Sequence, residues 1–167
     1  EWDYTGFLYS GANLTFKDVT LDFTPDTVHV PNIYAAGDLE FYNVTFLAQS
    51  LTKTEIVEEE EVTTTENPTI AAQGYTKGVY PFNSKADFDA MAVDGKYTAT
   101  VTFSGATDVP SCFSVYALYK LYNNAAGLPA TLTYGDGEVS RRALGGKIVV
   151  KDTATINTNI QGAYVDA

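Results

Sequence analysis

The sequence predicts a mainly β fold, and three observations support this prediction. The aromatic content is 13 %, with 12 Tyr and 9 Phe, and Thr and Val are abundant, all residue types that favour strands. Apolar and polar residues alternate in several short runs, as they do in strands with one buried face. A short pattern of this kind also occurs twice near the N-terminus.

The repeated pattern lies between Gly11 and Phe46. Residues 12–21, ANLTFKDVTL, are echoed by residues 37–46, GDLEFYNVTF, at a constant offset. Apolar side chains fall on matching positions: Leu14/Leu39, Phe16/Phe41, Val19/Val44 and Leu21/Phe46. The alternation breaks at Asp18 and Asn43, residue types that tolerate the left-handed backbone of a tight corner.

A unit of strand, corner and strand that recurs after roughly 25 residues predicts one coil of a parallel β-solenoid, in which successive coils stack and share a core. We therefore expect Phe16 to stack on Phe41 and Asp18 to stack with Asn43. Val19, Leu21 and Phe23 should then face inward. Two copies are fewer than the ~3 repeats of a stable stack, so an antiparallel β-sandwich or jelly roll stays open as the alternative.

The pattern L-x-F-x-(D/N)-V-T-(L/F) resembles coils of right-handed parallel β-helix proteins, the pectate-lyase-like and bacterial surface-protein class. The resemblance covers about residues 11–47, with a weaker echo at Gly146–Asp152. It implies stacked coils for the fold. Polysaccharide lyases of this class often use Ca²⁺ and a basic residue.

A chain of 167 residues suits one domain with a sizeable core. We expect residues 1–167 to form a single β-rich domain, with an exposed acidic arm or hairpin at residues 51–69. One or two short helices are expected. The first covers Ser84–Val93 with Ser84 as its N-cap, and at residues 112–122 the spacing slightly favours a helix over a strand.

Other segments are predicted to be strands. Trp2–Tyr9 is a short aromatic strand. Lys96–Ser104 places Tyr97, Ala99, Val101 and Phe103 on one face. Thr131–Tyr134 enters a tight turn, and Lys147–Ile156 forms a further strand.

The net charge is −11 and the isoelectric point is about 4.3. Such a surface repels phosphate backbones and anionic lipid, so neither nucleic-acid binding nor membrane insertion is expected. Cys112 is the only cysteine, which excludes an internal disulfide. The chain starts at Glu1 without a signal peptide, which favours a mature product or an excised domain.

The sequence shows no catalytic, cofactor or zinc motif, and His29 is the only histidine. Ca²⁺ at the glutamate run Glu58–Glu61 has weak support, because calcium sites normally need a bent loop. Glycoside cleavage needs two carboxylates that face each other across a cleft. Candidate acids such as Asp18, Asp22, Asp38 and Glu40 are present, but any acidic solenoid would supply them. We therefore expect no enzyme and no cofactor, with a polysaccharide-degrading β-helix enzyme as the second alternative.

We expect a non-enzymatic, extracellular or cell-surface structural protein that self-assembles, such as a filament, sheath or coat-type subunit. It would associate with itself or with other surface proteins. The candidate interface residues are Glu58, Glu59, Glu60 and Glu61, and the cationic pair Arg141 and Arg142, which would meet the glutamates of another molecule.

The first alternative function is an adhesin or glycan-binding module, because tyrosines can stack on sugar rings. Two further candidate sites are the glycosylation sequons at Asn13 and Asn43. In the stacked-coil prediction, Asn43 sits at an exposed corner.

Overall fold

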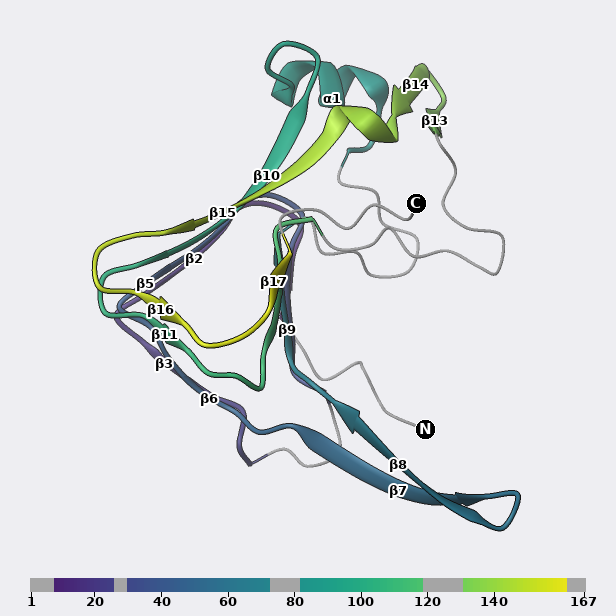
Figure 1. Ribbon diagram of the computed structural model, residues 1–167. Helices are drawn as coiled ribbons and strands as arrows, with labels where there is room; N and C mark the ends of the chain where they lie inside the picture. Colours follow the sequence, from purple (N-terminus) through teal and green to yellow (C-terminus); the bar gives the residue numbers. More distant parts are fainter. Residues whose placement is uncertain (1–7, 26–29, 73–81, 119–130, 162–167) are drawn as a thin grey trace.

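The computed structural model describes residues 8–25, 30–72, 82–118 and 131–161. The protein is mainly β, and three parallel sheets form its body (Figure 1). The first sheet contains β1 (Leu8–Ser10), β4 (Asn32–Ala35), β9 (Thr69–Ala72), β12 (Ser114–Tyr116) and β17 (Ile160–Gln161). The second contains β15 (Leu144–Val150), β10 (Tyr97–Ser104), β5 (Leu39–Tyr42) and β2 (Leu14–Lys17). The third contains β16 (Thr155–Ile156), β11 (Asp108–Val109), β6 (Thr45–Leu47) and β3 (Thr20–Asp22).

The chain visits these three sheets in turn. Strands β1, β2 and β3 belong to the first, second and third sheet, and β4, β5 and β6 repeat that order. Neighbouring strands within each sheet pair in parallel. The antiparallel sandwich alternative is therefore wrong for the body of the protein. Among the described residues, antiparallel strand pairing is confined to two hairpins, β7 (Leu51–Val57) with β8 (Glu60–Glu66) and β13 (Thr131–Tyr134) with β14 (Gly137–Ser140).

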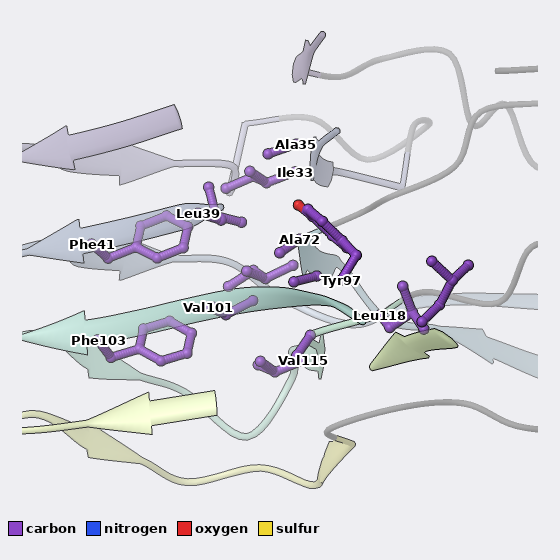
Figure 2. Close-up of a cluster of buried hydrophobic side chains, with 14 of the residues drawn as sticks. Ile33, Ala35, Leu39, Phe41, Ala72, Tyr97, Val101, Phe103, Val115 and Leu118 are labelled. Carbon is purple, nitrogen blue, oxygen red and sulfur yellow. The ribbon is translucent and has the colours of Figure 1, made fainter. Parts of the chain in front are cut away.

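The repeat found in the sequence sets the pairing of the second and third sheets. Leu14 pairs with Leu39 and Phe16 with Phe41, and Leu21 pairs with Phe46. The rings of Phe16 and Phe41 stack with centroids 5.2 Å apart, as predicted. Phe103 extends this column with a centroid distance of 5.3 Å to Phe41, and Figure 2 shows these two rings on neighbouring strands.

The predicted corners are present between the second and third sheets. Asp18 and Asn43 adopt positive φ angles of 54° and 50°, and Gly105 and Asp152 turn the chain at the equivalent places with φ of 63° and 59°. The expected strand Lys147–Ile156 is therefore two strands, β15 and β16, separated by the Asp152 corner. The weak echo at Gly146–Asp152 marks this further corner.

The prediction that Val19 faces inward was wrong. Val44 is fully buried, whereas Val19, at the matching position, is 40 % exposed. The difference arises because β2 and β3 are edge strands, each with one neighbour in its sheet. Leu21 and Phe23 are half-buried and pack against the core, as expected.

The core lies between the three sheets (Figure 2). Its largest fully buried side chains include Phe41, Phe103, Phe113, Ile33 and Leu39. Burying one such side chain contributes about 1.5–3 kcal/mol relative to leaving it exposed. The column of rings is therefore a principal source of stability.

Residues 112–118 are not helical, so the preference for a helix there was wrong. Ser114–Tyr116 form β12, which pairs in parallel with β9 and β17. Phe113, Val115 and Ala117 point inward and are buried, which is the strand alternation rather than the helical spacing. The local sequence fits both a helix and a strand, and pairing with a neighbouring strand on each side favours the strand. Residues 119–122 lie outside the described residues, as do His29 and most of the Trp2–Tyr9 strand.

Two hairpins, one helix and one 3₁₀ turn extend from the sheets. The hairpin strands β7 (Leu51–Val57) and β8 (Glu60–Glu66) leave one vertex of the body, and the helix α1 (Lys85–Met91) lies at another (Figure 1). The hairpin strands β13 (Thr131–Tyr134) and β14 (Gly137–Ser140) and the 3₁₀ turn η1 (Arg141–Ala143) lie near α1. The predicted helix, the Tyr97–Phe103 face and the Thr131–Tyr134 strand are thus confirmed.

Candidate functional site

The acidic segment 51–69 contains a long hairpin. β7 and β8 pair from Leu51↔Glu66 to Val57↔Glu60. The hairpin is inserted between β6 of the third sheet and β9 of the first, and it projects from the body (Figure 1).

The base of this hairpin is fixed to the body. Leu51 and Thr69 are buried, and the Ser50 hydroxyl donates a hydrogen bond to Asn67 Oδ1 at 2.7 Å. These contacts tie the two ends of the insertion together. The remainder of the hairpin is thereby held at a defined place on the surface.

The outer part of the hairpin exposes apolar side chains. Ile56 is 79 % exposed, Val57 50 % and Val62 44 %. An isolated two-stranded hairpin is only marginally stable in water, and side chains from Thr54 to Thr65 are exposed on both faces. Val57 and Val62 share one face of the hairpin and Ile56 lies on the other. Exposed apolar side chains on both faces of such an element indicate an interaction surface.

The two faces of the hairpin differ. One carries Thr54 and Thr63, whose hydroxyls lie 3.1 Å apart in a hydrogen bond, and Ile56. The other carries Lys53 and Glu55, which form an ion pair. The hydrogen bond and charge of Lys53 lower the pKa of Glu55. The acidic charge near the base is thus partly compensated.

The turn of the hairpin is strained. Glu58 and Glu59 have φ angles of 53° and 72°, a conformation for which two-residue hairpin turns prefer Asn-Gly. A non-glycine residue held there costs about 1–3 kcal/mol. Glu60 and Glu61 follow directly and face Val57 and Ile56 across the strands. Because the four glutamates stabilise neither the turn nor one another, the arrangement indicates a role outside the hairpin itself. We define Ile56–Glu61 as the hairpin tip.

The other predicted interface element, Arg141 and Arg142, lies in η1. Ser140 caps this turn, because its hydroxyl oxygen accepts a hydrogen bond from the Arg142 backbone N–H at 3.3 Å. The Arg142 side chain is exposed and that of Arg141 is half-buried. Within the described parts of the chain, no ion pair involves either arginine or the glutamates of the hairpin tip.

Helix α1 is clamped at its N-terminus by the neighbouring hairpin. Asp136, in the turn between β13 and β14, accepts hydrogen bonds from the backbone N–H groups of Lys85 at 2.8 Å and Ala86 at 2.9 Å. These two bonds lower the pKa of the Asp136 carboxyl. Ser84 accepts a further bond from the Asp87 N–H at 3.0 Å, as expected of the N-cap.

The end of α1 brings exposed apolar residues near the arginines. Met91 is 46 % exposed and Val93 75 %. Val93 pairs with Lys96 in a tight turn. Lys96 directly precedes Tyr97, which is the partner of Leu144, and Leu144 directly follows η1. The turn and η1 therefore lie side by side. We define α1, residues 92–96 and η1 as the helix corner.

The hairpin tip and the helix corner lie at opposite sides of the body (Figure 1). The structure therefore does not bring Glu58–Glu61 and Arg141–Arg142 together within one chain. Their contact between two molecules stays a prediction.

The two sequons occupy different surroundings. Asn13 Oδ1 accepts a hydrogen bond from the Asp38 N–H at 2.9 Å, and Asn13 is exposed. Asn43 is half-buried, and its Nδ2 donates to Asp18 Oδ1 at 2.8 Å. An N-linked glycan on Asn43 would be attached to Nδ2, the atom that donates to Asp18 at the neighbouring corner. Asn13 is therefore the better placed of the two sequons for glycosylation.

The acids named for polysaccharide cleavage do not converge. Asp18 lies at the corner, while Asp22 accepts two hydrogen bonds from Thr24, which lower its pKa. Asp38 Oδ1 accepts from the Thr100 N–H at 2.9 Å, and Glu40 lies on β5. The described residues contain no cluster of acids, histidines or cysteines suited to a metal ion.

Cys112 is partly buried, and its thiol contacts the Ala48 carbonyl at 3.5 Å. Burial raises the pKa of this thiol. In the portion of the chain that the structure describes, no helix has the length and hydropathy needed to cross a membrane.

Sequence reasoning missed Met91 and Val93, because their exposure depends on how α1 packs. It also missed Asp136, whose partners Lys85 and Ala86 lie far away along the chain. The only signal for Asp136 was its place in a Gly-Asp-Gly turn. No protein-family model matches the chain, and comparisons with curated proteins and with solved structures give no significant match.

Proposed function

We propose that the protein is a parallel β-solenoid of the β-helix type that serves as a non-enzymatic, self-assembling structural subunit outside the cell or on its surface. The observation that carries this proposal is the β7–β8 hairpin, which is anchored at its base and exposed beyond it. Such an arm is suited to reach a second molecule.

Two features support the solenoid part of the proposal. The chain passes through three parallel sheets in a repeated order, and matching side chains of successive rounds pair in register. In solenoids each repeat contacts only its neighbours and the long flanks become binding surfaces. Insertions at the vertices, such as the hairpin, then serve as contact elements.

The charges of the chain support self-association through specific patches. The net charge of −11 opposes random aggregation. Glu58–Glu61 and the pair Arg141–Arg142 carry opposite charges on opposite sides of the body. We therefore propose these six residues as parts of the interface between copies.

The test is the size of the purified protein as a function of concentration. Light scattering and sedimentation should show species larger than the 18.1 kDa chain, and negative-stain microscopy should show regular particles or filaments. A protein that stays monomeric at millimolar concentration would overturn the proposed function.

A further inference from the structure

The hairpin tip and the helix corner complement each other in hydrophobicity. The tip exposes Ile56 and Val57, and the corner exposes Met91 and Val93. Ile56 and Val57 point to opposite faces of the hairpin, so one face presents Ile56 beside Glu61. Each patch thus has apolar side chains next to charged ones, as in the centre and rim of a protein interface.

The two patches also complement each other in charge. The tip has four glutamates, and the corner has Arg141, Arg142 and Lys96. The corner also contains three acids, Asp87, Asp89 and Asp94. Asp89 forms an ion pair with Lys85, while Asp87 accepts a hydrogen bond from the Asn83 N–H and keeps its charge. Asp94, in the Val93–Lys96 turn, is the acid closest to the proposed contact.

We propose that the hairpin tip of one copy docks on the helix corner of a second copy, with the Ile56 face of the tip against Met91 and Val93. Glu61, which lies on the same face as Ile56, and the turn glutamates then face Arg141 and Arg142. This inference rests on the proposed function, since it requires that copies associate. Exposed ion pairs contribute little affinity and mainly set orientation, so the apolar residues hold the contact.

The geometry makes this contact heterologous. Because the tip and the corner lie at opposite sides of the body (Figure 1), the tip of a chain does not contact the corner of the same chain. Each docked copy presents a free corner or a free tip to the next copy. A contact of this type extends into an open chain unless rotation closes it into a ring.

The first experiment replaces single apolar residues and measures association by sedimentation. Ile56→Ser and Val93→Ser should each weaken association at least tenfold. Val19→Ser is the matched control, because Val19 is an exposed valine between β2 and β3, and these strands lie away from both patches. This control should associate like the wild type. Circular dichroism verifies that all three variants fold.

The second experiment reverses charges. Glu58→Lys/Glu59→Lys/Glu60→Lys/Glu61→Lys reverses the charge of the tip and Arg141→Glu/Arg142→Glu reverses that of the two arginines, and each variant should lose long assemblies. A chain that carries both sets of changes should regain them, because the charges are again opposite.

Mixing the two charge-reversal variants gives the sharpest result. The wild-type tip of the corner variant matches the wild-type corner of the tip variant, and the reversed tip matches the reversed corner, so the mixture should regain long assemblies in which the two variants alternate. If the wild type assembles but these variants assemble equally well, the docking proposal is overturned and the proposed function stands. If the wild type is monomeric, both are overturned.

Discussion

Asn43 donates its side-chain amide to Asp18, with 2.8 Å between Asn43 Nδ2 and Asp18 Oδ1. Its Oδ1 accepts a hydrogen bond from the Ala106 N–H at 2.9 Å. One amide therefore joins three successive corners between the second and third sheets. A corner residue at this place must both donate and accept, which the amide of asparagine does with two separate atoms and a carboxylate cannot do.

Asn43→Asp should destabilise the protein by about 1–3 kcal/mol, because it replaces the donor with a second carboxylate facing Asp18. Urea unfolding at pH 7 measures this loss. Asp18→Asn in the same chain should restore most of the stability, since it swaps donor and acceptor. A single variant as stable as the wild type would show that the corner bond contributes nothing.

Gly105→Ala should be more damaging than an ordinary glycine substitution. Gly105 has φ of +63°, and an added Cβ would lie 2.1 Å from Asn43 Oδ1. The left-handed backbone alone costs about 1–2 kcal/mol for a side chain, and Asn43 must also move. The control is Gly11→Ala, whose added Cβ meets no atom within 4 Å. Equal midpoints in urea for the two variants would contradict this account.

Phe41→Ala should cost about 3–5 kcal/mol in the free energy of unfolding. Phe41 is fully buried and stacks between Phe16 and Phe103. Phe16→Ala should cost clearly less, because Phe16 is half-buried on an edge strand. Chemical denaturation of both variants checks the order, and a larger loss for Phe16→Ala would mean that the column is not the main core.

The sequence revealed the first two rounds of the chain because no insertion separates them. Leu14 pairs with Leu39, and the described residues between them contain only strands of the three sheets. The next partner of Leu39 is Val101, which follows the β7–β8 hairpin and α1. The partner of Val101 is Ile148, which follows the β13–β14 hairpin. These insertions lengthen the later rounds unequally, so a fixed period cannot find them.

The interaction surface was predictable only in part. The glutamate run was visible because it is a local change in composition, and its β-rich flanks indicated a hairpin. The apolar half of each patch was not visible, since Ile56 and Val93 resemble any strand or helix-end residue until their exposure is known. Long-range hydrogen bonds such as those of Asp136 leave no local pattern at all.

The clamp on α1 should weaken in acid. Backbone hydrogen bonds from Lys85 and Ala86 lower the pKa of Asp136 in the folded protein. The ionised carboxylate therefore stabilises the fold above the pKa of the unfolded chain, and this contribution is lost as the pH falls below about 4 and through the folded pKa. The protection factors of the Lys85 and Ala86 amides, which compare the observed exchange with the intrinsic rate at each pH, should fall over that range. Asp136→Asn should remove this fall; an unchanged profile would contradict the assignment.

Glu58→Asn/Glu59→Gly should stabilise the hairpin and weaken association at the same time. The two wild-type glutamates hold positive φ angles of 53° and 72°, and Asn-Gly is the preferred pair for such a turn, so the backbone strain of about 1–3 kcal/mol per residue is relieved. Slower amide exchange of Glu55 and Val62, a hydrogen-bonded pair of the hairpin, would measure the gain, while sedimentation measures association. Glu58→Gln/Glu59→Gln is the control, because it removes the same charges but keeps the strain: association should weaken without any gain in hairpin protection. If the Asn-Gly variant associates more strongly than the wild type, the glutamates are not contact residues, and the strain at the tip has another origin.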